Sequence, residues 1–358
     1  MKKFVALALA LTMCLALVAC GGSKPAAPAA PAAPAAPAAP AAPAAPAAPE
    51  APKFEKQTWK FACSATENTV WADMGRQFGK MVNEATGGAV TVEVYAADQL
   101  TAGNQTEGIQ GAIDGTIELS AHSNLIYSSF DQRLNVVSLP FAFSSFEDVD
   151  AKLDGEAGKA VGKVVEDMGL HLLGIGENGF RHPTNSVRPI DSLAAMKGLK
   201  LRVAGSQLLN AAYGKWGANW SNANWSEVYT GLQTGTYEGQ ENPLPTADGA
   251  SIAEVQKYVT YWTGVYDCIF FTMNGELYDS LSPELKAIVD EAGAKAAQQQ
   301  RKLQREEDQV VLKKWADAGV VVTELTPEAA AEFKAASDPC YAEFEEVLTK
   351  ELVDAFTK

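Results

Sequence analysis

A glycine-rich segment in the middle of the chain is the first candidate for chemistry. Gly174-Ile-Gly176-Glu-Asn-Gly179 follows a strand-like segment and matches G-x-G-x-x-G, the pattern in which a helix that begins at the last glycine binds a pyrophosphate. The ten residues that follow include Pro183 and Pro189 and have no apolar period, so no helix is predicted there. We therefore predict an interdomain turn and no dinucleotide cofactor.

Metal-binding and catalytic patterns are also missing from the sequence. The three histidines, His122, His171 and His182, do not have the spacing of a metal site, and no H-E-x-x-H, G-x-S-x-G or P-loop pattern occurs. The 44 acidic residues contain no recognisable acid–base pair. These observations predict a protein that holds no metal or cofactor and is not an enzyme.

The first part of the chain has the features of an export signal followed by a tether. Met1-Lys2-Lys3 and an apolar run precede Leu17-Val18-Ala19-Cys20, which resembles the lipobox of bacterial lipoproteins. We predict a signal peptide over residues 1–19, lipidation of Cys20, and an anchor and Ala/Pro-rich linker over residues 20–56. The Ala-Ala-Pro repeats favour polyproline II, and 28 such residues from Pro25 to Pro52 would reach on the order of 85 Å. An ordinary secretory signal with a chance cysteine is the alternative.

Charge and cysteine content limit the partners further. The formal net charge of −15 argues against nucleic acid and anionic lipid as partners. No later segment is long and apolar enough to cross a bilayer, so the acyl anchor is the only predicted membrane attachment. Cys63, Cys268 and Cys340 are far apart, which favours buried thiols and leaves a single disulfide open.

Apolar periodicity indicates alternating strands and helices, as in α/β domains. Strands are predicted at 59–65, 90–95, 117–120, 170–173 and 199–203, and helices at 70–84, 108–115 and 146–167. Between two N-cap signals, Ser282-Pro283 and Thr326-Pro327, residues 284–318 contain almost no helix breaker. They predict one helix of about 35 residues, roughly 50 Å long, which is enough to span two domains.

The second half carries ordered motifs that resemble one known family. They are Asn178-Gly179-Phe-Arg181, Lys197-Gly-Leu-Lys-Leu-Arg202-Val, Ser226-Glu-Val-Tyr229-Thr-Gly-Leu-Gln-Thr234-Gly and Gly239-Gln-Glu-Asn242-Pro. Over residues 57–358 the chain resembles the solute-binding component of tripartite ATP-independent periplasmic (TRAP) transporters, the DctP family. The resemblance implies an α/β clamshell of two domains, 57–178 with 268–300 and 179–267 with 301–358, crossed by the long helix.

The resemblance also implies a binding site for an organic anion in the interdomain cleft. Arg202 matches the arginine that holds the ligand carboxylate, and a guanidinium suits this task because its planar fork of donors stays charged when desolvated. A strand-end salt bridge is the alternative for Arg202. Arg181 and Asn242 match further ligand contacts, and Trp225 matches an aromatic ring packed against the ligand.

The first domain is expected to contribute Ser64, His122 and Ser123. Family members that bind a sialic-type sugar acid tend to have an acidic residue around the position of Ser123 in the sequence, and this chain has none there, so the resemblance disfavours sialic acid as the ligand. Residues 218–224 are rich in asparagine where family members carry prolines, so analogy is weakest there. Trp71 and Gln105 also lie near the expected cleft, but ordinary loop and helix-start roles explain them equally well, and neither is included in the predicted site.

The predicted function is that of a periplasmic, lipid-anchored receptor that captures a small carboxylate, or a sulfonate, and delivers it to the TRAP permease subunits in the membrane. The alternative is a sensory module that signals to a membrane kinase through a similar clamshell. Permease genes beside this gene would favour transport, and a kinase gene alone would favour sensing. A periplasmic hydrolase ranks third, since no catalytic motif supports it, and an ATP-coupled uptake receptor shares the architecture but not the ordered motifs.

Overall fold

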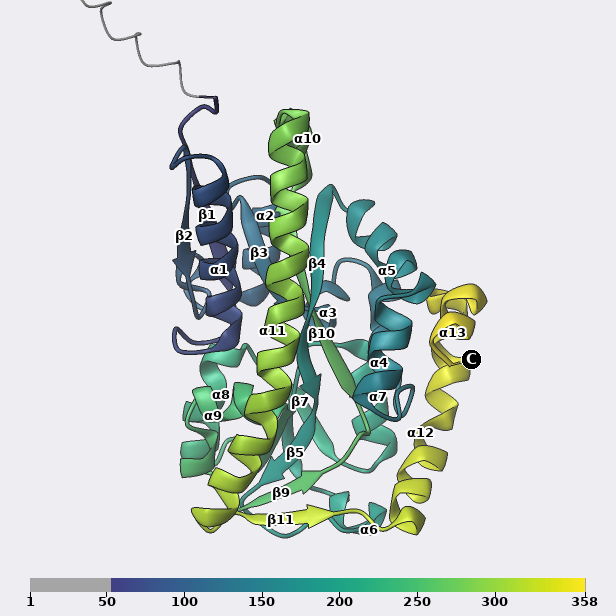
Figure 1. Ribbon diagram of the computed structural model, residues 1–358. Helices are drawn as coiled ribbons and strands as arrows, with labels where there is room; N and C mark the ends of the chain where they lie inside the picture. Colours follow the sequence, from purple (N-terminus) through teal and green to yellow (C-terminus); the bar gives the residue numbers. More distant parts are fainter. Residues whose placement is uncertain (1–52, 358) are drawn as a thin grey trace, which may run out of the picture. The chain divides into compact units, whose positions relative to one another are not determined.

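The computed structural model describes residues 53–357, which contain two β-sheets, each at the centre of one lobe (Figure 1). The predicted signal peptide, Cys20 and most of the predicted linker lie outside the described residues. Phe54, near the start of the described chain, is already buried. No helix among residues 53–357 is long and apolar enough to cross a membrane.

The first lobe contains a mixed five-stranded sheet. Its strand order is β2 (Val90–Tyr95), β1 (Gln57–Cys63), β3 (Leu119–Ser123), β10 (Tyr266–Asn274) and β4 (Leu170–Phe180). The first three strands are parallel, and β10 runs antiparallel to both β3 and β4. Its helical segments are α1 (Val70–Ala85), η1 (Gln99–Thr101), α2 (Gln105–Ile113), α3 (Asn124–Tyr127), η2 (Gln132–Ser138), α4 (Phe146–Leu153), α5 (Glu156–Glu166) and α10 (Gly275–Ser280).

The second lobe contains a six-stranded sheet. Its order is β11 (Val321–Glu324), β9 (Tyr258–Tyr261), β5 (His182–Asn185), β8 (Gly239–Asn242), β6 (Lys200–Val203) and β7 (Asn219–Asn222). The helical segments between these strands are α6 (Leu193–Met196), α7 (Gln207–Lys215), α8 (Trp225–Gln233), α9 (Leu244–Gly249) and η3 (Ile252–Glu254). The chain ends in α12 (Pro327–Leu348) and α13 (Lys350–Thr357).

The long helix predicted from the two N-cap signals is present as α11 (Pro283–Asp317). Ser282 caps it by accepting a hydrogen bond from the Leu285 amide, and Pro283 occupies the first turn, where its missing N–H has no cost. Val289 packs in the core of the first lobe, and Trp315 packs in the core of the second. The helix therefore runs past both lobes, as Figure 1 shows.

The glycine-rich segment is not the interdomain turn that its prolines suggested, because Gly174–Gly179 lies inside β4. A Cβ on Gly174 would come within 2.7 Å of the Ala297 Cβ, and one on Gly176 within 2.8 Å of the Gln300 Oε1. The two glycines therefore allow α11 to lie directly on β4. Their spacing reflects helix–strand packing rather than nucleotide binding.

The predicted helix over 146–167 is also incorrect in detail. It is split into α4 and α5 at Asp154 and Gly155, where α4 ends and Gly155 adopts an extended backbone. Most of the other predicted elements are present with boundaries shifted by a few residues, and the strand predicted at 170–173 is the start of the longer β4. Cys63, Cys268 and Cys340 are all buried and unpaired, so the question of a disulfide is answered in favour of free thiols.

Candidate ligand-binding site

A pocket lies between the two lobes, at the ends of strands from both sheets. The first lobe lines it with residues just after β1, at the start of α1, at the start of α2 and at the β3–α3 junction. The second lobe lines it mainly with residues from β6, α8, β8 and α9. Across the rim, the Ser226 hydroxyl donates to the Gly103 carbonyl at 3.2 Å and the Thr66 hydroxyl donates to the Gly249 carbonyl at 3.0 Å, so the lobes are closed on the pocket.

Arg202 enters this pocket from β6, with 2 % of its surface exposed. Its Nε and Nη2 atoms donate to the Ala223 carbonyl at 3.0 and 2.7 Å. No carboxylate among residues 53–357 forms an ion pair with it, and burial lowers the pKa of its guanidinium to about 10. A buried cation without a counter-ion is costly, so the pocket has a place for an external anion.

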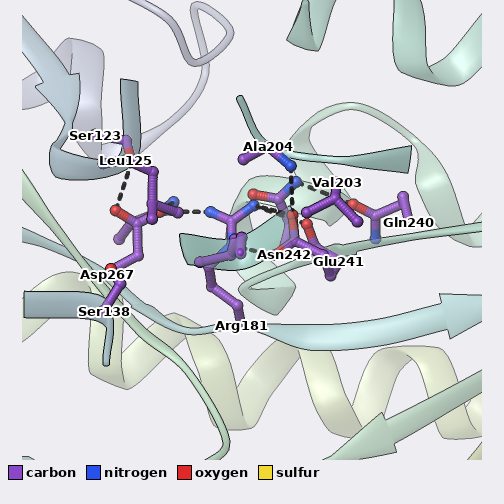
Figure 2. Close-up of polar contacts among 12 residues, drawn as sticks. Ser123, Leu125, Ser138, Arg181, Val203, Ala204, Gln240, Glu241, Asn242 and Asp267 are labelled. Carbon is purple, nitrogen blue, oxygen red and sulfur yellow. Dashed lines mark hydrogen bonds and ion pairs between the residues drawn. The ribbon is translucent and has the colours of Figure 1, made fainter. Parts of the chain in front are cut away.

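Arg181 also lines the pocket, but its charge is already compensated (Figure 2). Its Nε pairs with the Glu241 carboxylate and its Nη1 with Asp267, while Nη2 donates to the Glu241 carbonyl at 2.8 Å and to Oε1 at 2.9 Å. Burial alone would lower the pKa of Arg181, but the two carboxylates outweigh it and the pKa is raised. Arg181 is therefore held as part of a fixed ionic cluster.

Asn242 and Trp225 complete the wall of the second lobe. Asn242 is buried at the end of β8, and its Nδ2 donates to the Gln240 Oε1 at 3.0 Å, which leaves its Oδ1 facing no described donor. Trp225 is the first residue of α8, and the Arg202 guanidinium carbon lies 5.8 Å from the centroid of its ring. The ring supports the guanidinium and lowers the local polarity around it.

Two polar atoms of the first lobe are buried in this wall without a hydrogen-bond partner among the described residues. They are the Ser64 Oγ, just after β1, and the Trp71 Nε1, at the start of α1. Buried polar atoms in native proteins are nearly always hydrogen-bonded, so this pair marks a position for a polar ligand group. Gln105 lines the same wall, and no hydrogen bond of its amide to the described residues is present.

The structure brings Ser123 to the pocket and places His122 away from it. The Ser123 Oγ donates to the Asp267 Oδ1 at 2.7 Å and accepts from the Leu125 amide, so its only proton is already used. His122 is fully buried behind this wall and is bonded through Nε2 to the Asp98 carboxylate at 2.7 Å. Side chains alternate along a strand, which is why neighbouring residues of β3 face different environments.

Sequence reasoning thus named six residues that line one pocket: Ser64, Ser123, Arg181, Arg202, Trp225 and Asn242. It left out Trp71 and Gln105, although both had been placed near the cleft. It missed Asn178 and Thr246, which also line the pocket. Asn178 lies in the Asn178-Gly179-Phe-Arg181 motif, which was the only signal for it, and Thr246 had none. No cluster of potential metal ligands occurs among residues 53–357.

Two α/β lobes that close on a pocket with one uncompensated arginine define a clamshell solute-binding protein. Comparison with known sequences specifies the family. Residues 61–347 match the model for bacterial extracellular solute-binding protein, family 7, the DctP family, and the chain belongs to this family.

The chain is 30% identical over 274 residues to the 2,3-diketo-L-gulonate-binding periplasmic protein YiaO of Escherichia coli, covering 76% of this chain and 83% of that protein. It is 28% identical over 298 residues to the C4-dicarboxylate-binding protein DctP of Rhodobacter capsulatus, covering 83% and 89%.

Solved structures agree. A TRAP solute-binding protein of Ralstonia eutropha with bound (S)-2-acetolactate is 31% identical, with a TM-score of 0.81, covering 84% of this chain and 97% of that chain. The galactonate complex of a sugar acid binding protein from Advenella mimigardefordensis is 28% identical, with a TM-score of 0.82, covering 85% and 97%. The protein is an extracytoplasmic TRAP-type receptor for a small organic anion and not an enzyme.

Proposed function

We propose that the protein binds the carboxylate of its ligand through Arg202, in the pocket between the lobes. The observation that carries this proposal is the burial of Arg202 without an ion pair to any described residue. Asn242 orients a second ligand oxygen, Trp225 supplies an apolar face, and Ser64 lies opposite on the first lobe. Arg181 acts mainly by fixing Glu241 and Asp267. The related receptors bound to galactonate and to acetolactate support this role, since both ligands are carboxylic acids.

The test is calorimetric titration of the purified protein with a panel of organic acids, combined with an Arg202→Met variant. We expect one chemical class to bind to the wild type and binding to be lost in the variant. Arg188→Met is a matched control, because Arg188 also donates only to backbone carbonyls, those of Ala195 and Lys197, and lies outside the pocket. Unchanged affinity in Arg202→Met would refute the assignment of the anion site.

Capture is coupled to transport through closure of the lobes. We propose that residues 57–178 with 268–300 and residues 179–267 with 301–358 rotate as the two moving parts, with α11 bending between them. The ligand favours the closed state, and TRAP permease subunits in the membrane must favour release, because transport requires reversible closure. Identical lobe orientations in ligand-free and ligand-bound crystals would contradict this mechanism.

Attachment to the membrane is a separate proposal. We propose that Cys20 is lipidated after cleavage of the signal peptide and that the Ala/Pro-rich linker holds the lobes away from the bilayer. The Cys20→Ser variant is expected to move from the membrane fraction to the soluble periplasmic fraction. If the variant remains in the membrane fraction to the same extent as the wild type, lipidation at Cys20 is refuted.

A further inference from the structure

We infer that the ligand is a hydroxylated monocarboxylate and that the pocket rejects dicarboxylates. This inference rests on the proposed function, because it assumes that the ligand carboxylate lies on Arg202. It follows from the charges that line the pocket and from the hydrogen bonds that its polar side chains have already made.

The pocket offers one cation for a ligand. Arg181 and Arg202 are the only charged side chains among the described residues that line it, and Arg181 is already paired with Glu241 and Asp267. The charges of these two arginines and two carboxylates cancel. A monoanion brings these four groups to one net negative charge, which lies next to Arg202, whereas a dianion adds a second negative charge with no further cation among the lining residues. Burying an uncompensated charge is strongly unfavourable.

Two hydroxyl groups of the pocket can only accept a further hydrogen bond. The Ser123 Oγ gives its proton to the Asp267 Oδ1 at 2.7 Å, and the Thr246 Oγ1 gives its proton to the Asn178 Oδ1. Their remaining lone pairs need a donor, which a ligand hydroxyl supplies and an ionised carboxylate cannot. The protons already donated by Ser123 and Thr246 and the lack of a second free cation are therefore two separate reasons why a hydroxyl fits better than a second carboxylate.

Neutral groups also surround the position opposite Arg202. The Trp71 Nε1 can only donate, whereas the Ser64 hydroxyl and the Gln105 amide can donate and accept. Each of the three can donate to a ligand oxygen, so this wall accepts a hydroxyl group, and it has no cation to balance a second carboxylate. A vestibule that shares Gln105 with the pocket is lined by Thr106, Asn222 and Asn224, and no charged side chain lines it. An extended polyhydroxy chain would continue into this neutral space.

The experiment compares ligand pairs that differ only at the end opposite the carboxylate. Calorimetric titration of the purified protein uses galactonate against galactarate, 4-hydroxybutyrate against succinate, and glycerate against hydroxymalonate. We expect a hydroxy monoacid to bind at least 100-fold more tightly than its diacid, which corresponds to about 2.7 kcal/mol. A diacid that binds as tightly as its partner, or better, would overturn the inference.

A charge-gain variant tests the same point from the side of the protein. Gln105→Lys supplies a cation to the neutral wall and is expected to raise the affinity for the diacid at least tenfold relative to the monoacid. Gln105→Met, which has a similar length and no charge, should not change this ratio in favour of the diacid. An equal ratio in the two variants would show that charge at this wall does not set selectivity.

The outcomes separate this inference from the proposed function. If a diacid is preferred and its binding is lost in Arg202→Met, the anion site stands and the inference is wrong. If the monoacid is preferred but Arg202→Met binds it normally, the anion site is wrong and the inference loses its basis. If none of the six acids binds, the inference is overturned whatever the broader panel shows.

Discussion

Two buried arginines on neighbouring parts of the second lobe should respond to the same substitution in opposite directions. Arg202→Met and Arg181→Met each replace a guanidinium with an apolar side chain that retains much of its length. Arg202 forms no ion pair with the described residues, whereas Arg181 is paired with Glu241 and Asp267. Removing Arg202 therefore removes the free-energy cost of burying an unpaired cation, whereas removing Arg181 leaves Glu241 and Asp267 as buried carboxylates without their cation.

The magnitudes follow from the structure. Lowering the pKa of Arg202 from 12.5 to about 10 corresponds to roughly 3 kcal/mol of destabilisation by the buried charge at neutral pH. Losing its two hydrogen bonds to the Ala223 carbonyl costs about 1–2 kcal/mol. We expect Arg202→Met to be more stable than the wild type without ligand by up to about 1–2 kcal/mol, with the full gain applying to protein whose lobes are closed. Arg181→Met should lose about 3–5 kcal/mol, because two buried carboxylates lose their partner.

The assay is urea unfolding followed by tryptophan fluorescence, on protein first freed of any bound ligand by unfolding, dialysis and refolding. Adding ligand at about 100 times its Kd should stabilise the wild type by roughly 2.7 kcal/mol and leave Arg202→Met unchanged. If Arg202→Met lost several kcal/mol of unfolding free energy while Arg181→Met lost little, Arg181 would be the uncompensated cation and Arg202 the compensated one. The anion would then be expected at Arg181.

Two further predictions concern α11. Asp308 accepts a hydrogen bond from the Tyr261 hydroxyl, and burial raises its pKa to about 6. Between about pH 4 and 6 the folded state therefore binds more protons than the unfolded state, and the stability of the protein falls as pH rises through this window. Asp308→Asn should gain up to about 3 kcal/mol over the wild type in urea unfolding at pH 7.5 and nothing at pH 4; an equal gain at both pH values would disprove this origin. The added Cβ of Gly174→Ala would lie 2.7 Å from the Ala297 Cβ, so this variant should lose about 1–3 kcal/mol of unfolding free energy in the same assay. The control is Gly205→Ala, whose added Cβ has no atom within 4 Å and which should be neutral or slightly stabilising. Equal stability of the two alanine variants would show that α11 does not need Gly174.

Local signals were sufficient for much of the fold. The two Pro-containing caps and the lack of breakers predicted α11, and period-two apolar alternation predicted β2 with its exact bounds. The glycine-rich segment was misassigned because a glycine that admits a neighbouring helix looks the same in sequence as a glycine that forms a turn. Only the contact between Gly174 and Ala297 distinguishes them, and these residues are 123 positions apart.

The site shows the same division between local and long-range information. The motifs placed Arg181 and Arg202 in the site but gave both a similar role. Their difference depends on Glu241 and Asp267, which come from β8 and β10 and are 60 and 86 residues from Arg181. Likewise, His122 and Ser123 are neighbours in sequence, and only the pleat of β3 determines that Ser123 lines the pocket while His122 pairs with Asp98.

The unmet polar groups of the pocket also explain how ligand binding can control closure. Arg202 comes from one lobe, and the Ser64 Oγ and the Trp71 Nε1 come from the other. Closing the lobes without ligand removes water from all three groups, at roughly 3 kcal/mol for Arg202 and about 1–3 kcal/mol for each buried unpaired atom. The sum is comparable to the roughly 5.5 kcal/mol needed to shift a two-state equilibrium from 1:99 to 99:1. An acid that meets the three groups together removes this penalty, so we expect the empty protein to favour the open state and the loaded protein to favour the closed state. Such a difference would give the proposed permease partner a means of recognising loaded receptors.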